Sequence, residues 1–252
     1  MGATEKKEVT AIIQARLGST RLPAKIMADI RGKPMLLWVL ERVAEAKRID
    51  NIVVATTTLD EDRAVANRAE SWGFGVFRGS AEDVLSRYFG AAEQFKCCQV
   101  VRITSDCPLI DPQIADLVIG EHLDGGYDYT SNTLDRRTYP RGLDVECFTF
   151  ETLRLAADSA REDYQKEHVT PYIFENPEMF SLHFVPAPAN LAFPEMRICV
   201  DTIEDLEAAR TIFEAFPDED KGPDAAQVVR FLLEHPEVIE INTEVKQKEL
   251  RQ

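Results

Sequence analysis

Residues 9–25 read VTAIIQARLGSTRLPAK and carry the most informative pattern in this chain. The first five residues are mainly apolar and β-branched, which predicts a buried strand. The residues that follow supply three cations, a glycine and two hydroxyls, namely Arg16, Gly18, Ser19, Thr20, Arg21 and Lys25. Glycine lets backbone N–H groups approach an anion, and arginine and lysine provide charge-assisted donors to phosphate oxygens. We therefore predict a loop that binds a nucleoside triphosphate at the carboxyl end of the strand.

The charge distribution supports a small anionic ligand. The 252-residue chain has a formal net charge of −15, with 29 basic and 44 acidic residues, so nucleic acid is not an expected partner. Residues 16–33 nevertheless carry five basic residues and one acid. A positive pocket on an acidic body concentrates small anions. The alternative is a solvated basic helix face, which the glycine, serine and proline residues of this stretch disfavour.

Composition predicts a globular enzyme of the cytoplasm. Hydrophobic residues make up 44% of the chain, enough for one large α/β domain with or without a small appendage. No apolar run approaches the roughly 20 residues of a membrane span, so no membrane partner is expected. The five cysteines form no CxxC pair and are expected to be reduced thiols. Cys107, next to Asp106, remains open as an alternative nucleophile.

Strand-like and helix-like segments alternate over the first half of the chain. Predicted strands cover residues 9–13, 51–56, 75–77 and 99–104, and predicted helices cover residues 35–47, 61–72, 81–95 and 112–123. Asp111 directly precedes the last of these helices as its predicted N-cap. This order predicts an α/β fold: a doubly wound, mostly parallel, Rossmann-like sheet with helices on both faces.

The second half has a different rhythm. Short β-like segments at residues 127–132, 142–148 and 180–185 predict a small antiparallel extension over residues 126–190, which would cover the site or form a dimer contact. Residues 197–200 then read as a strand returning to the core, followed by helices at 203–216 and 225–233 and by a charged tail at 244–252. Neither GxxxxGK[ST] nor GxGxxG occurs, because Gly32-Lys33 precedes a proline and Gly75 precedes no further glycine at the required spacing.

Two aspartates follow predicted strands. Asp106 comes after the strand at 99–104, and Asp201 after the strand at 197–200. Carboxyl ends of neighbouring strands converge on one crevice, and two carboxylates beside a triphosphate are suitable ligands for Mg²⁺. Each also has a structural interpretation, because Thr202-x-x-Asp205 is a capping box and Asp106 is a common turn former. Together with the basic loop, the pair favours a magnesium site.

Three motifs carry a resemblance to a known family: Arg16-x-Gly-Ser-Thr-Arg-Leu-Pro-x-Lys25, Arg102-x-x-x-Asp106-Cys-Pro-Leu, and Val200-Asp-Thr-x-Glu-Asp205-Leu. Across residues 9–215 the chain resembles the cytidylyltransferases, such as the CMP-Kdo and CMP-sialic acid synthetases, and most of all the spore coat polysaccharide biosynthesis protein F group. The resemblance implies a nucleotidyltransferase domain at residues 9–217, followed by a C-terminal helix and charged tail at residues 218–252. It also implies a reaction of CTP with a small-molecule acceptor that releases pyrophosphate, and a homodimer.

The resemblance also implies roles for particular residues. Catalytic roles fall on two cations and two carboxylates, namely Arg16, Lys25, Asp106 and Asp201, with Mg²⁺ as the cofactor held by the two aspartates. Gly18, Ser19 and Arg21 would complete the triphosphate loop. Contacts to the base are expected from Gln14, Ala15, Arg78, Gly79, Ser80 and Asp83. Ser80-x-x-Asp83 is alternatively a helix cap.

Residues near position 140 are candidates for the acceptor. Asp144 and Glu146 lie two residues apart, so a strand would place them on one face. They would bind hydroxyls or a second metal, and Arg141 would pair with an acceptor carboxylate or phosphate; a solvated edge strand is the alternative. His168 is either a general base or a helix residue in a dimer interface.

The sequence therefore favours transfer of a cytidylyl group from CTP to a sugar or small acidic or phosphorylated acceptor in polysaccharide or glycoconjugate synthesis. A transferase of another nucleotide is the nearest alternative. A glycosyltransferase would use the Asp-x-Asp motif of Asp60-Glu61-Asp62, which looks like a helix start. A non-catalytic nucleotide-binding subunit is the remaining possibility.

Overall fold

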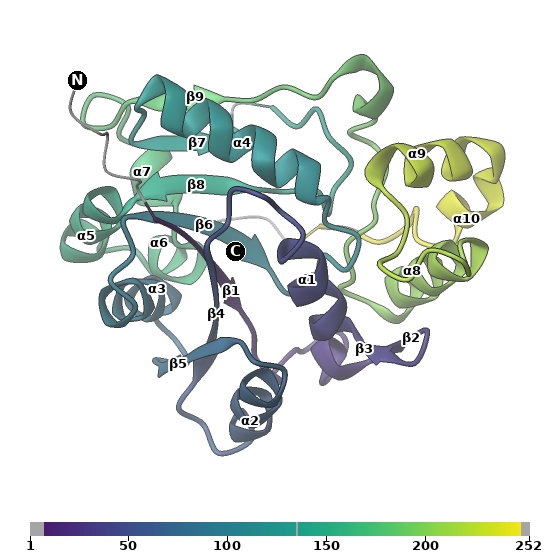
Figure 1. Cartoon of the computed structure of the whole chain (residues 1–252), viewed down its shortest axis with the longest axis horizontal. Coiled ribbons are helices and arrows are strands. Elements are labelled where there is room, and N and C mark those ends of the chain that lie inside the picture. The colour runs from purple at the N-terminus through teal and green to yellow at the C-terminus, as the bar shows by residue number, and fades with distance from the viewer. Residues whose placement is uncertain (1–7, 135, 248–252) are drawn as a thin grey trace.

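A seven-stranded sheet forms the centre of the protein (Figure 1), in the order β5-β4-β1-β6-β8-β7-β9. The computed structural model describes residues 8–134 and 136–247. The strands are β1 (Val9–Gln14), β4 (Asn51–Thr57), β5 (Gly75–Gly79), β6 (Gln99–Thr104), β7 (Tyr129–Ser131), β8 (Glu146–Thr149) and β9 (Leu182–Phe184). Strand β8 runs against its neighbours, and the other pairs are parallel. Strands β2 (Asp29–Ile30) and β3 (Lys33–Pro34) form a small separate antiparallel pair. The predicted α/β class with a mostly parallel sheet is confirmed.

Helices cover both faces of this sheet. They are η1 (Lys25–Met27), α1 (Met35–Val43), α2 (Arg63–Ser71), α3 (Val84–Gln94), α4 (Pro112–Gly125), α5 (Phe150–Ser159), α6 (Asp163–His168), α7 (Pro171–Phe174), η2 (Ala189–Leu191), α8 (Ile203–Ala215), α9 (Ala225–Glu234) and α10 (Pro236–Glu240). Successive residues of β1 point to opposite faces. Ile13 joins the apolar cluster of α1, α2, α4, α8 and α9, and Ile12 joins that of α3, α5 and α7.

The C-terminal helices α8, α9 and α10 gather at one end of the molecule (Figure 1). Two side chains of α1, Trp38 and Arg42, contact this C-terminal region. The Trp38 ring lies 4.5 Å from that of Phe213. Arg42 donates to the carbonyl oxygens of Ile110, Lys221 and Pro223 at 2.6, 2.5 and 2.8 Å. No helix in the described ranges is both long and apolar enough to cross a membrane.

The predicted N-cap of α4 is confirmed, because the Asp111 carboxylate accepts from the amides of Gln113 and Ile114 at 2.8 and 3.4 Å. The predicted strand at 197–200 is wrong. Within residues 8–134 and 136–247, its only ladder contact is an isolated bridge between Arg197 and Arg141. The reason is topological: β8 already pairs with the edge of β6 that this segment would need.

The predicted extension also differs in detail. Only β8 is antiparallel there, since β9 pairs with β7 in parallel. The strand predicted from residue 142 begins at Glu146, because Gly142 has a φ of +112° that is incompatible with an extended strand. The bounds of helices α6, α7 and α10 were not predicted, although a helix at His168 was one of the two interpretations of that residue; at four to six residues these helices are too short to show a helical period.

Candidate functional site

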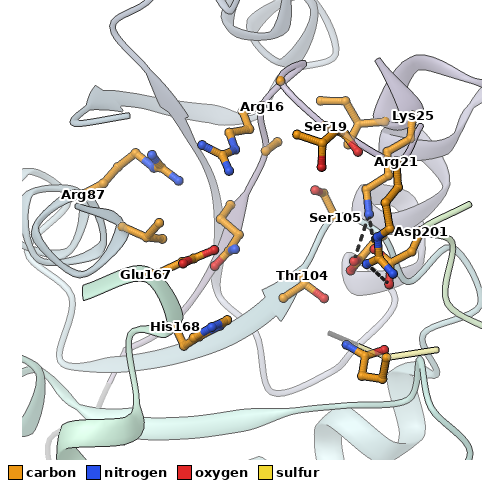
Figure 2. A pocket seen from close by; sticks show the side chains of 18 residues that line it. Arg16, Ser19, Arg21, Lys25, Arg87, Thr104, Ser105, Glu167, His168 and Asp201 are labelled. Carbon is orange, nitrogen blue, oxygen red and sulfur yellow. Dashed lines mark hydrogen bonds and ion pairs between the residues drawn. The ribbon is translucent and has the colours of Figure 1, made fainter. Parts of the chain in front are cut away.

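A pocket of about 380 Å³, here called the loop pocket, lies at the carboxyl ends of β1 and β6 (Figure 2). The sheet places it there because both strands point the same way and are hydrogen-bonded neighbours. Its lining includes ten of the residues predicted from the sequence: Gln14, Ala15, Arg16, Gly18, Ser19, Arg21, Lys25, Asp106, His168 and Asp201. The fold thus brings the basic loop, both aspartates and the histidine to one cavity.

Lys25 joins the two aspartates. Its Nζ donates to Asp201 Oδ1 at 2.7 Å (Figure 2). It also donates to Asp106 Oδ2 at 3.1 Å and to the carbonyl oxygen of Val200 at 2.8 Å. The lysine side chain is 13% exposed. The sequence predicts that Lys25 binds a triphosphate; in this structure, its ammonium group bonds the two carboxylates.

Asp201 is the most heavily compensated carboxylate of the loop pocket. Its Oδ2 contacts the guanidinium groups of Arg21 at 2.9 Å and Arg197 at 2.8 Å. Burial opposes ionisation of Asp201, but Lys25, Arg197 and Arg21 overcome it and lower the pKa of Asp201 to about 2. Burial likewise lowers the pKa of Lys25, yet its two carboxylate partners raise it further, so the net pKa is above the ordinary value. Both groups are therefore charged at neutral pH.

The capping box predicted for Thr202 and Asp205 is present at the start of α8. The Asp205 amide bonds Thr202 Oγ1, and Asp205 Oδ2 accepts from the Thr202 amide at 3.1 Å. The same carboxylate accepts from the amide of Asp201 at 2.9 Å and binds Arg197 at 2.7 and 3.0 Å. Asp201 can therefore precede a helix cap and also line the pocket. Asp205, the acidic residue of the capping box, binds the Asp201 amide and also Arg197, which is a cation partner of Asp201. Arg197 was not predicted as a site residue, because no motif in the neighbouring sequence indicates that its side chain lies at the site.

The residues present suit a divalent cation with few protein ligands. Two aspartate carboxylates converge on a single cation, the Lys25 ammonium. No cluster of three or more metal-ligating side chains occurs in the part of the chain that the structure describes. Mg²⁺ is commonly held by one or two carboxylates, with waters and substrate phosphates in the other positions. Asp106 and Asp201 fit that donor set, provided that Lys25 moves away from them.

Two further cations border the loop pocket. Arg16 donates to the carbonyl oxygen of Ala81 at 3.3 Å, and Arg87 donates to that of Ser80. Arg87 is 2% exposed, and within the described ranges its Nε has no hydrogen-bond partner. The side chains of both arginines line the pocket (Figure 2). Arg87 was missed because an arginine within a helical pattern is usually a surface residue.

The stretch predicted to contact the base lies outside the pocket lining. Neither Arg78, Gly79, Ser80 nor Asp83 is among the lining residues. Arg78 donates to the carbonyl oxygens of Thr57 and Leu59 at 2.9 and 2.8 Å, away from the cavity. Asp83 caps α3 by accepting from the Ser86 amide at 2.7 Å, so the helix cap is present, and the base contacts of this stretch stay a prediction.

A second cavity of about 260 Å³, here called the side pocket, shares Thr104 and His168 with the loop pocket. Its lining contains the predicted residues Asp144 and Glu146, together with Arg102, Thr133, Arg137, Thr170, Pro171 and Phe174. Arg141 lies elsewhere, in a cavity beside Arg197 and the C-terminal segment. Glu146 does not lie on a solvated edge strand, because β8 lies between β6 and β7.

Two alternatives lose support. Asp62, the second carboxylate of the Asp-x-Asp motif, accepts from the amide of Leu17 at 2.7 Å and from the Thr57 hydroxyl. Asp62 is fully buried, and its carboxylate binds the backbone of the basic loop. It is therefore not available to bind a metal, which the Asp-x-Asp motif of a glycosyltransferase would require. Cys107 is buried, and burial raises the pKa of its thiol well above the ordinary value. A thiol of this kind is a poor nucleophile.

Comparisons with known proteins agree with this geometry. The family model described as cytidylyltransferase matches residues 10–244. The uncharacterized protein MJ1063 of Methanocaldococcus jannaschii is 37% identical over 97% of this chain and 98% of its own length. The spore coat polysaccharide biosynthesis protein SpsF of Bacillus subtilis is 34% identical over 82% of this chain and 87% of its own.

The fold has a match among solved structures. A cytidylyltransferase structure from Leptospira borgpetersenii superposes with a TM-score of 0.87 at 34% identity, covering 96% of this chain and 99% of the other. The resemblance drawn from the three motifs is confirmed. The chain belongs to the cytidylyltransferase family.

Proposed function

We propose that the protein transfers a cytidylyl group from CTP to a sugar acceptor in a Mg²⁺-dependent reaction that releases pyrophosphate. The observation that carries this proposal is the pair of neighbouring cavities. The loop pocket gathers cations and two aspartates around a space of about 380 Å³, and the side pocket shares the lining residues Thr104 and His168 with it. Family membership and the similarity to SpsF support the nucleotide and a role in polysaccharide synthesis.

In this proposal the basic loop holds the triphosphate. Arg16, Arg21 and Arg87 border the loop pocket and donate to phosphate oxygens. Lys25 exchanges its two carboxylate partners for the leaving phosphates, where it offsets the charge that develops. Asp106 and Asp201 would hold Mg²⁺, which would supply neutralisation of the phosphate charge.

The transfer is an in-line displacement at the α-phosphorus. The acceptor oxygen forms a bond to this phosphorus, and the bond to the β-phosphate oxygen breaks, so that pyrophosphate leaves with the electron pair. His168 lies where the two pockets meet, and there it would accept the proton from an acceptor hydroxyl. Catalysis of this kind rests on positioning and charge, and it needs no protein nucleophile.

The first experiment is a thermal shift with CTP, UTP, GTP or ATP, with and without Mg²⁺, followed by pyrophosphate release over a panel of sugars. CTP should give the largest shift, and Asp106→Asn should abolish its Mg²⁺-dependent part. Asp60→Asn is the matched control, since Asp60 is 95% exposed and lies outside the pocket. A preference for another nucleotide, or no pyrophosphate with any sugar, would refute the proposal.

A second variant tests the role of Lys25. Lys25→Ala should weaken binding of CTP far more than binding of cytidine, because only CTP carries the phosphates. Equal losses for the two ligands would mean that Lys25 acts through folding alone.

A further inference from the structure

The charged residues that line the side pocket bear on the kind of sugar that it could hold. We infer that the part of the acceptor entering this pocket is a hydroxyl-rich ring without a carboxylate group. The inference rests on the proposed function and narrows it, since the sequence left both neutral and acidic acceptors open. The inference depends on two ion pairs in the lining of the side pocket, Arg137 with Asp144 and Arg102 with Glu146.

The first pair uses both terminal nitrogens of its arginine. Arg137 Nη1 and Nη2 donate to Asp144 Oδ1 and Oδ2 at 2.5 and 2.7 Å, so the guanidinium already has a bidentate carboxylate partner. The side chains of Arg137 and Asp144 are 19% and 33% exposed. A substrate carboxylate would have to displace Asp144 from its best-matched partner in order to use Arg137.

The second pair is buried in the sheet. Arg102 and Glu146 face one another across β6 and β8, and Arg102 Nη1 contacts Glu146 Oε2. The other oxygen, Oε1, accepts from the hydroxyls of Tyr129 and Thr170 at 2.5 and 2.6 Å. Arg102 therefore has its counter-charge within the protein, as Arg137 does. An entering carboxylate would meet two fixed carboxylates and two arginines that each already have a carboxylate counter-charge, although the buried Arg102 Nε has no hydrogen-bond partner within the described ranges.

The remaining surface of the side pocket suits a neutral sugar. Asp144 offers partly exposed carboxylate oxygens that accept from ring hydroxyls, and Thr104 and Thr133 add hydroxyl donors and acceptors. Pro171 and Phe174 supply an apolar wall for the C–H face of a ring. A phosphate on such a sugar is compatible with this arrangement where it points into the loop pocket, which holds the cations.

The test compares kcat/KM for pyrophosphate release from Mg²⁺ and CTP across two sugar classes. One class holds aldoses and their 1-phosphates whose rings carry only hydroxyls; the other holds 3-deoxy-ulosonic and nonulosonic acids, which carry a carboxylate. The wild-type protein should favour the neutral class at least tenfold. Asp144→Asn should raise the ratio of acidic to neutral kcat/KM at least tenfold, because the Arg137 fork is then open to a substrate carboxylate.

Two further variants test whether the change in sugar preference depends on the Arg137 guanidinium. Arg137→Gln removes the cation and should give no gain with acidic sugars, even though the pair is equally broken. Asp158→Asn, on the exposed face of α5, should leave the ratio unchanged. A wild-type preference for acidic sugars that falls in Asp144→Asn would overturn the inference and leave cytidylyl transfer intact. Failure of every sugar despite CTP binding would refute the proposed function, and the inference with it.

Discussion

Replacing Lys25 by methionine tests how the two aspartates are held. The change removes the ammonium that bonds Asp106 and Asp201 at 3.1 and 2.7 Å and keeps an unbranched side chain of similar length. The two carboxylates are then left facing one another. Asp201 keeps Arg21 and Arg197, whereas Asp106 loses the lysine partner found in the structure.

The magnitude follows from the electrostatics. The pKa of Asp201 falls from 3.8 to about 2, with Lys25 the largest favourable contributor, and this shift corresponds to about 2 kcal/mol. Breaking a buried pair costs about 3–5 kcal/mol, and the two remaining arginines reduce the loss toward the lower end. We therefore expect the free energy of unfolding to fall by about 3 kcal/mol at pH 7, with a Tm lower by about 6–12 °C for a domain of this size.

The pH dependence has a defined sign. The folded-state pKa of Asp201 lies below its ordinary value, so the stability it contributes is complete above about pH 4 and is lost as the pH falls toward 2. Lys25 is shifted upward, so its contribution is complete below about pH 10 and is lost as the pH rises further. The difference between wild-type protein and Lys25→Met should therefore be largest between these limits and shrink beyond both.

Urea unfolding in EDTA measures the loss, and a thermal shift with Mg²⁺ alone measures metal binding without nucleotide. Mg²⁺ alone should stabilise Lys25→Met more than the wild-type protein, because the ammonium no longer occupies the space between the carboxylates. Lys33→Met is the control: its pair with Glu41 is about one-third exposed, so we expect a loss of about 1 kcal/mol or less. A loss below about 1 kcal/mol in Lys25→Met, with no added response to Mg²⁺, would refute this reasoning.

Three other predictions concern thiols, a turn and a cap. Cys98 is the only exposed cysteine, so a thiol reagent should label one site rapidly in the native protein and all five after unfolding; rapid labelling of a second site would contradict the burial. Gly142→Ala should cost about 2 kcal/mol or more in urea unfolding, because φ is +112° and a Cβ would lie 2.7 Å from the amide of Cys199. Asp111→Ala should cost about 2 kcal/mol, since its carboxylate caps α4 and accepts from the amide of Ala225 at 2.7 Å, while unchanged thermal unfolding would show that neither bond matters.

Elements whose signals are local could be predicted from the sequence. The β-branched run of β1, the cap at Asp111 and the capping box of Thr202 and Asp205 each depend on residues within a few positions of one another. Such patterns can be recognised in the sequence alone, because the strand period, the helix period and the geometry of a cap each involve residues that are close together in the chain. They were enough to predict the α/β class, and the three motifs were enough to indicate the family.

Contacts between charged residues that are distant in the sequence depend on long-range packing. Lys25 lies 81 and 176 residues from the aspartates it bonds, and no local pattern in the sequence encodes that contact. Arg87 and Arg137 border the two pockets for the same reason: helix packing and loop closure bring them there. Residues 197–200 have a strand-like composition, but β8 already occupies the edge of β6. Strand order, which long-range packing sets, therefore assembled the site from segments whose types the sequence had largely predicted.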